Sequence, residues 1–126
     1  MANEIEVSIS LSVNKGGLDA SRSESFKKTM AGDAITHSVQ ILPLSGANGE
    51  ILEVSDDFTY TNGAMWFVKN LDTTNYITIG EANTDAADMI RIDAGESTLF
   101  HSIAAIYAKG SHASNTVTVE YFAIEV

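Results

Sequence analysis

Short segments in which apolar and polar residues alternate, separated by polar turns, dominate this chain from residue 63 to residue 122. Alternation of this kind places every second side chain on the same face of a β-strand. No segment between two expected strands is long enough to supply the helical crossover that a parallel sheet requires. Closely spaced short strands with regular turn signals are typical of an antiparallel sandwich or barrel. The sequence therefore predicts an all-β fold.

The strictest alternation lies near the N-terminus. Nine consecutive residues alternate there between apolar and polar: Ile5, Glu6, Val7, Ser8, Ile9, Ser10, Leu11, Ser12 and Val13. We expect a strand with one apolar face and one polar, wet face, ending at Gly16–Gly17. Residues 21–30 are mostly polar and predict an edge strand or an extended arm. Lys27 and Lys28 suit an edge, because charge discourages unwanted strand addition.

The most apolar stretch is residues 65–68, which includes Trp66. Large side chains in consecutive positions predict a central strand that is covered on both faces. Asn62–Gly63, just before it, is a strong signal for a tight hairpin turn. Another turn over residues 71–75 predicts a return strand over residues 76–80. In all, we expect about eight to ten short strands in an antiparallel β-sandwich. This single domain would span residues 1–126, with residues 1–4 as a flexible tip.

Composition excludes several classes of function. The 126 residues carry a net charge of −10 and include no cysteine. An acidic surface repels phosphate groups, so we expect binding neither to nucleic acid nor to an anionic membrane. The N-terminus lacks the basic and apolar regions of a signal peptide, and no apolar run is long enough to span a bilayer. We therefore expect synthesis as a soluble chain in the cytoplasm.

No catalytic or metal-binding motif is present. The candidate ligands are three histidines and two carboxylate pairs: His37, His101, His112, Asp56–Asp57, and Asp85 with Asp88. The histidines lack zinc-site spacing, and neither pair matches a calcium-binding loop, so we interpret them as surface and turn residues. No G-x-S-x-G or phosphate-binding loop occurs either. We therefore expect no enzymatic activity, no metal and no cofactor.

Aromatic side chains offer another candidate site. Five of them fall in or beside expected strands: Trp66, Tyr76, Tyr107, Tyr121 and Phe122. They could line a platform for carbohydrate binding. Aromatic residues in alternating strands more often belong to the core or to a subunit interface, and we favour that interpretation, above all for Trp66.

Five segments, taken together, resemble a pattern in small virion proteins of tailed bacteriophages. They are FVKNL (67–71), NYITIG (75–80), IDAGE (92–96), IYAK (106–109) and VTVEY (117–121). The pattern is similar to that of jelly-roll proteins that decorate or cement phage heads, and of some minor tail proteins. It covers about half of the chain and marks where strands turn. By this resemblance, Asn70 and Asn75 bound a hairpin loop, and Gly95–Glu96 forms a tight turn.

The resemblance implies a non-enzymatic structural protein of the virion, assembled in the host cytoplasm. Such a protein decorates and stabilises the capsid exterior by binding assembled subunits of the major capsid protein, commonly as a homotrimer. The alternative is a tail-tip or fibre-associated module that recognises a host glycan or protein. For contact with the capsid or another subunit, the candidates are Asn3, Ile5, Val7 and Trp66. Asn3 lies in the polar N-terminal tip, and Ile5 and Val7 lie in the strand that follows, which can add to the edge of a neighbouring sheet.

Overall fold

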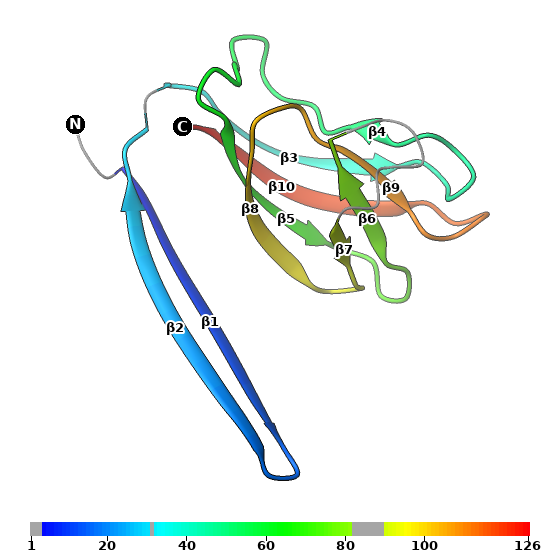
Figure 1. Cartoon of the computed structure of the whole chain (residues 1–126). Helices are drawn as coiled ribbons and strands as arrows, with labels where there is room; N and C mark the ends of the chain where they lie inside the picture. The colour runs from blue at the N-terminus through cyan, green and yellow to red at the C-terminus, as the bar shows by residue number, and fades with distance from the viewer. Residues whose placement is uncertain (1–3, 31, 82–89) are drawn as a thin grey trace. The chain divides into compact units, whose positions relative to one another are not determined.

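The computed structural model describes residues 4–30, 32–81 and 90–126, which form ten strands and no helix (Figure 1). The all-β prediction is therefore confirmed. The chain divides into two compact units, residues 1–31 and residues 32–126, and each is described by itself. The part of the chain that the structure describes contains no helix capable of crossing a membrane.

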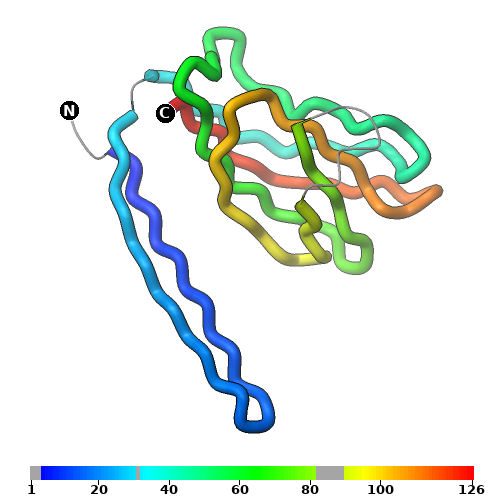
Figure 2. The backbone as a smooth tube through the Cα atoms, in the orientation of Figure 1, coloured from blue at the N-terminus to red at the C-terminus, as the bar shows by residue number. Residues whose placement is uncertain are grey.

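The first unit is a two-stranded antiparallel hairpin of β1 (Ile5–Lys15) and β2 (Leu18–Lys28). Figure 2 shows it as a long ribbon closed by a tight turn. Gly16 and Gly17 form that turn with φ angles of 53° and 90°. Glycine adopts such angles without steric cost, and two left-handed residues match the twist of the strands that they join. The predicted first strand and its stop at the glycines are confirmed.

The second unit is a sandwich of two four-stranded antiparallel sheets. The first sheet has the order β3 (Ile35–Leu42), β10 (Val117–Glu125), β5 (Ala64–Asn70), β8 (Ser97–Ser102). The second has the order β4 (Glu50–Ile51), β9 (Tyr107–Gly110), β6 (Ile77–Gly80), β7 (Ile90–Ile92). Numbered from β3, the two orders are 1-8-3-6 and 2-7-4-5, which is the jelly-roll arrangement. The expected jelly-roll-like sandwich is therefore present.

The core lies between the two sheets and centres on Trp66 and Tyr121, neither of which is exposed. The ring of Trp66 packs against those of Phe100 and Tyr121, with centroids 6.3 and 5.9 Å away. Its indole N–H donates to Ser102 Oγ at 2.9 Å. A buried indole needs such a partner, because an unpaired polar group in a core is costly. The core interpretation of Trp66 is confirmed.

Two local predictions were wrong. The turn after β5 does not close a hairpin, because β5 and β6 belong to different sheets and the segment crosses between them. Asn62–Gly63 was expected to be a hairpin turn, but residues 58–61, which precede it, form no strand that could pair with β5. The turn itself is present: Gly63 has φ of 89°, and its N–H donates to Tyr60 O at 2.9 Å. Turn residues specify a local reversal but not the strand that pairs afterwards.

Candidate binding surface on the hairpin

The hairpin has one apolar face, built by both of its strands. Residues paired across an antiparallel ribbon lie on the same face. The register pairs Val7 with Phe26 and Lys15 with Leu18. The alternating apolar residues of β1 therefore share their face with Leu18 and Phe26 of β2. The sequence alone did not reveal the contribution of β2, because charged residues interrupt its alternation.

Most of this apolar face is exposed. Five side chains, here called the apolar strip, are between 44% and 70% exposed: Ile9, Leu11, Val13, Leu18 and Phe26. Burying one such side chain fully stabilises a protein by about 1.5–3 kcal/mol, so covering the strip would release several kcal/mol. A two-stranded hairpin is by itself only marginally stable in water. The strip therefore has the properties of a surface that a partner covers.

One ion pair lies within the apolar face. Arg22 is paired with Leu11 and Glu24 with Ile9 in the register of the hairpin. Arg22 Nε donates to Glu24 Oε1 at 2.7 Å. Exposed ion pairs contribute little to stability, about 0–1 kcal/mol. Such a pair is better suited to orienting a partner on the strip, since charges fix register at an interface.

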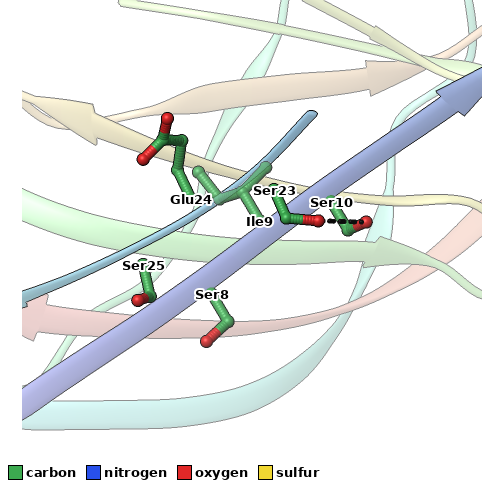
Figure 3. A pocket seen from close by; sticks show the side chains of 6 residues that line it. All are labelled: Ser8, Ile9, Ser10, Ser23, Glu24 and Ser25. Carbon is green, nitrogen blue, oxygen red and sulfur yellow. Dashed lines mark hydrogen bonds between the residues drawn. The ribbon is translucent and has the colours of Figure 1, made fainter. Parts of the chain in front are cut away.

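The opposite face of the hairpin is polar and shallow. Three cross-strand pairs of serine occupy it: Ser8 with Ser25, Ser10 with Ser23, and Ser12 with Ser21. The hydroxyl oxygens of Ser10 and Ser23 lie 3.1 Å apart and share a hydrogen bond. Figure 3 shows four of these serines, Ser8, Ser10, Ser23 and Ser25, which line an open hollow together with Ile9 and Glu24. The two faces therefore differ sharply, and the expected polar face is confirmed.

The hairpin also has open edges. Within the described residues, β1 pairs only with β2 and β2 only with β1. Each strand therefore has backbone N–H and C=O groups along its outer edge without a partner strand. Such an edge accepts a further strand through main-chain hydrogen bonds. A partner can thus contact both the apolar strip and an edge.

Charge is divided unequally between the two units. Residues 1–31 contain four basic and four acidic residues and are neutral. Residues 32–126 contain three basic and 13 acidic residues and carry the whole net charge of −10. The net charge of the sandwich opposes the approach of other acidic surfaces at long range, whereas the neutral hairpin approaches a second protein without that cost. The charge distribution therefore favours the hairpin as the contact element.

The predicted contact residues fall into different places. Asn3 lies outside the described residues. Ile5 and Val7 lie at the open end of β1 and are only 7% and 4% exposed, so the exposed strip begins at Ile9. Trp66 is not exposed at all, and it therefore stabilises the sandwich core instead of presenting a surface to a partner. The exposed continuation of the predicted strand is therefore the better candidate for a contact surface.

The five aromatic candidates form no common platform. Trp66 and Tyr121 are buried between the sheets. Phe122, next to Tyr121 on β10, points to the other side of its sheet. Tyr76 is half-buried beneath the guanidinium of Arg91, which lies 3.8 Å from the ring centroid. The structure therefore does not assemble the carbohydrate platform that their spacing in the sequence allowed.

The histidines lie apart and have separate roles. The Nδ1 atom of His112 accepts hydrogen bonds from the N–H groups of Ser114 and Asn115 at 3.1 and 2.9 Å. His37 Nε2 lies 2.8 Å from a carboxylate oxygen of Glu120. Among the described residues, no three His, Asp or Glu side chains are grouped to hold a metal ion. Asp56–Asp57 occupies an exposed turn, whereas Asp85 and Asp88 lie outside those residues.

No family model matches this sequence, and neither a curated protein nor a solved structure matches it. Function is therefore inferred from the chain's own residues and geometry.

Proposed function

We propose that this protein is a non-enzymatic assembly protein that binds the exterior of a protein shell through its β1–β2 hairpin. The observation that carries the proposal is the apolar strip, which stands exposed on a ribbon with two open edges. The five segments that resemble phage head decoration proteins supply the partner: assembled subunits of the major capsid protein. In this proposal the protein stabilises the capsid surface of a bacteriophage virion and performs no chemistry.

The mechanism combines apolar burial with multiple attachment. A groove on the shell covers the apolar strip, while an open edge of the hairpin adds to a strand of the shell. The homotrimer that the resemblance implies presents three hairpins at once. Weak single contacts then combine, because each bound hairpin raises the effective concentration of the next. The acidic sandwich remains in solvent, where its charge keeps decorated particles apart.

Co-sedimentation with empty heads tests the proposal. The heads are assembled from the capsid protein encoded nearest to this chain. The test variant carries Leu11→Ser and Val13→Ser, which remove two exposed members of the apolar strip. The matched control is Ser12→Thr, which lies between them on the polar face. We expect the test variant to bind heads about tenfold more weakly or worse, since about 1.4 kcal/mol corresponds to a factor of ten.

Equal binding of the double variant and the control would show that the strip is not the contact. The melting temperature of the sandwich should be the same in both, because none of the three residues belongs to it. Binding to host cells or to a glycan array, without binding to heads, would instead support the tail-tip or fibre module and overturn the capsid assignment.

A further inference from the structure

The first sheet of the sandwich also has an apolar surface, on the side that faces away from the second sheet. In the register of β3, β10, β5 and β8, eight large apolar side chains share this side: Ile35, Val39, Ile41, Met65, Phe67, Leu99, Phe122 and Ile124. Five of them are between 37% and 62% exposed, Phe67 and Ile124 are half-buried, and Met65, at one end, is buried. We call this surface the outer face. Contiguous apolar surface of this kind on a soluble domain marks an interaction site.

An aromatic row crosses the middle of the outer face. Phe122 is paired with His37 on one side and with Phe67 on the other. The rings of Phe122 and His37 stack with centroids 4.1 Å apart, and Phe67 meets Phe122 edge-on at 6.2 Å. Leu99 continues the row on β8. Rings that support one another in this way form a rigid anchor, which costs little side-chain entropy on binding.

The neighbouring row of the outer face contains one acidic and one basic residue. Glu120 on β10 is paired directly with Lys69 on β5, and these are the two central strands of the sheet. The row is therefore close to neutral, although the sandwich as a whole carries −10. The acid and the base lie side by side on the two central strands. A two-fold rotation can therefore place the acid of one copy opposite the base of another, so the surface is complementary to itself.

We propose that the outer face binds the outer face of a second copy of this chain. The two-fold axis runs parallel to the strands, between β10 and β5. This rotation places β10 of each copy over β5 of the other, so Glu120 meets Lys69 of the second copy twice. Phe122 likewise meets Phe67 of the second copy. An axis across the strands at this row would instead stack Glu120 on Glu120, which like-charge repulsion disfavours.

The size of the outer face sets the strength of this contact. Four strands about 4.8 Å apart, with about seven residues each at about 3.4 Å, cover roughly 400 Å² per copy. Two copies bury about 800 Å² by this measure, which is below the roughly 1,200–2,000 Å² of stable specific interfaces and typical of a weak, transient one. Sheets pack face to face about 10 Å apart with their strands roughly 30° out of line, which preserves the matched rows near the axis. The association is therefore weak and depends on concentration.

This inference does not rest on the proposed function, since it uses the sandwich and not the hairpin. The contact is two-fold and is therefore additional to the trimer that the resemblance implies. Whatever assembly exists at low protein concentration should double in mass when its outer faces pair. A monomer would become a dimer, and a trimer would become a hexamer.

Sedimentation velocity over a wide range of protein concentration tests the proposal by charge reversal. We expect the weight-average mass of the natural protein to rise up to twofold with concentration. Glu120→Lys or Lys69→Glu alone should abolish the rise, because each places like charges across the contact. The double variant Glu120→Lys/Lys69→Glu should restore it. Asp57→Lys is the control: like Glu120→Lys it replaces a negative charge by a positive one, but at an exposed turn outside the outer face. It should leave the rise in mass unchanged.

The double variant separates the contact from effects within one chain. It lacks the natural bond between His37 and Glu120, as Glu120→Lys does, so its recovery cannot come from that bond. Three results would overturn the proposal: a mass independent of concentration in the natural protein, no recovery in the double variant, or a loss with Asp57→Lys. The proposal would also be overturned if Glu120→Lys lost binding to empty heads but kept the same dependence of mass on concentration as the natural protein. That result would assign the outer face to the shell. Thermal melting verifies that each variant folds.

Discussion

Asn70, at the end of β5 in the first sheet, donates from Nδ2 to the carbonyl oxygen of Ile92 on β7 in the second sheet, at 3.1 Å. The same amide donates to Asn75 O at 2.9 Å, and Asn70 Oδ1 accepts from Asp72 N at 2.9 Å. One fully buried side chain therefore joins the two sheets and shapes the segment that crosses between them. This role explains why an asparagine is needed where the chain changes sheet.

Replacement of Asn70 by alanine should destabilise the sandwich. The change leaves buried backbone groups without partners, and each costs about 1–3 kcal/mol. We expect the free energy of unfolding in a denaturant titration to fall by at least that amount. Asn48→Ala is the matched control, because Asn48 is exposed in the loop between β3 and β4. Equal stability of the two variants would mean that water replaces the bonds of Asn70 and that the link is not structural.

Two tyrosines give opposite predictions for removal of a hydroxyl group. Tyr121 donates its O–H to the carbonyl of Glu53, with Gln40 Oε1 3.2 Å away. The hydroxyl of Tyr60 is buried and has no hydrogen-bond partner among the described residues. Burial, with smaller effects of Tyr121 and Tyr107, raises the pKa of Tyr60 to about 12. Tyr60 therefore stays neutral but unpaired.

Tyr121→Phe should lower the free energy of unfolding by about 1–2 kcal/mol, whereas Tyr60→Phe should leave it unchanged or raise it slightly. The two substitutions remove the same atom, so each serves as the control for the other. Chemical denaturation of both variants measures the difference. The interpretation fails if Tyr60→Phe is the more destabilising of the two.

The carboxylate of Glu125 predicts a loss of stability in acid. The backbone N–H of Thr59 is the largest cause that lowers its pKa below the ordinary value of 4.5. The N–H groups of Asp33 and Ala34 also donate to it, at 3.0 and 3.1 Å. A group whose pKa is lower in the folded state stabilises above its unfolded pKa and loses that effect as pH falls through the folded pKa.

Stability should therefore decline below about pH 4.5, the ordinary value for a glutamate. Glu125→Gln should be less stable near neutral pH and should show a smaller decline in acid. Asp57→Asn also removes one negative charge but touches none of these bonds, so its acid profile should follow that of the natural protein. Melting temperatures measured from pH 7 to pH 3 test this. Parallel profiles for Glu125→Gln and the natural protein would contradict it.

Much of this fold was predictable, because strands and turns depend mainly on residues that are close together in the sequence. The period-two pattern of Ile5–Val13 gave a strand with one apolar and one polar face, and the paired glycines gave its end. Which strands pair with one another was not predictable. Nothing near Asn70 in the sequence indicates that the next strand joins the other sheet, and the carbonyl of Ile92 to which Asn70 donates lies 22 residues further along the chain.

Exposure was harder to predict than strand formation. Alternation shows which side chains share a face but not whether another layer covers it. The exposed faces of β1 and β3 show the same alternation of apolar and polar residues as a strand with a buried face. The apolar strip and the outer face can therefore be recognised only in the structure. Trp66 shows the converse: its place in the most apolar stretch was a sufficient signal for burial.

Trp66→Ala should strongly destabilise the sandwich. Truncation of a buried large aromatic typically costs about 3–5 kcal/mol, and this one also leaves Ser102 without its indole donor. We expect a marked fall in melting temperature or failure to fold. Trp66→Phe, which keeps most of the volume, should lose less. A melting temperature unchanged by Trp66→Ala would contradict the core assignment.

Hydrogen exchange tests the central claim most directly, by comparing backbone amides of the free protein with those of the protein bound to empty heads. A two-stranded ribbon with open edges should exchange quickly when free. The account predicts that binding slows exchange most strongly across residues 5–28, with the largest effect near Leu11 and Val13. Unchanged exchange in this hairpin, with new protection confined to residues 32–126, would show that the shell is bound by the sandwich and would contradict the account.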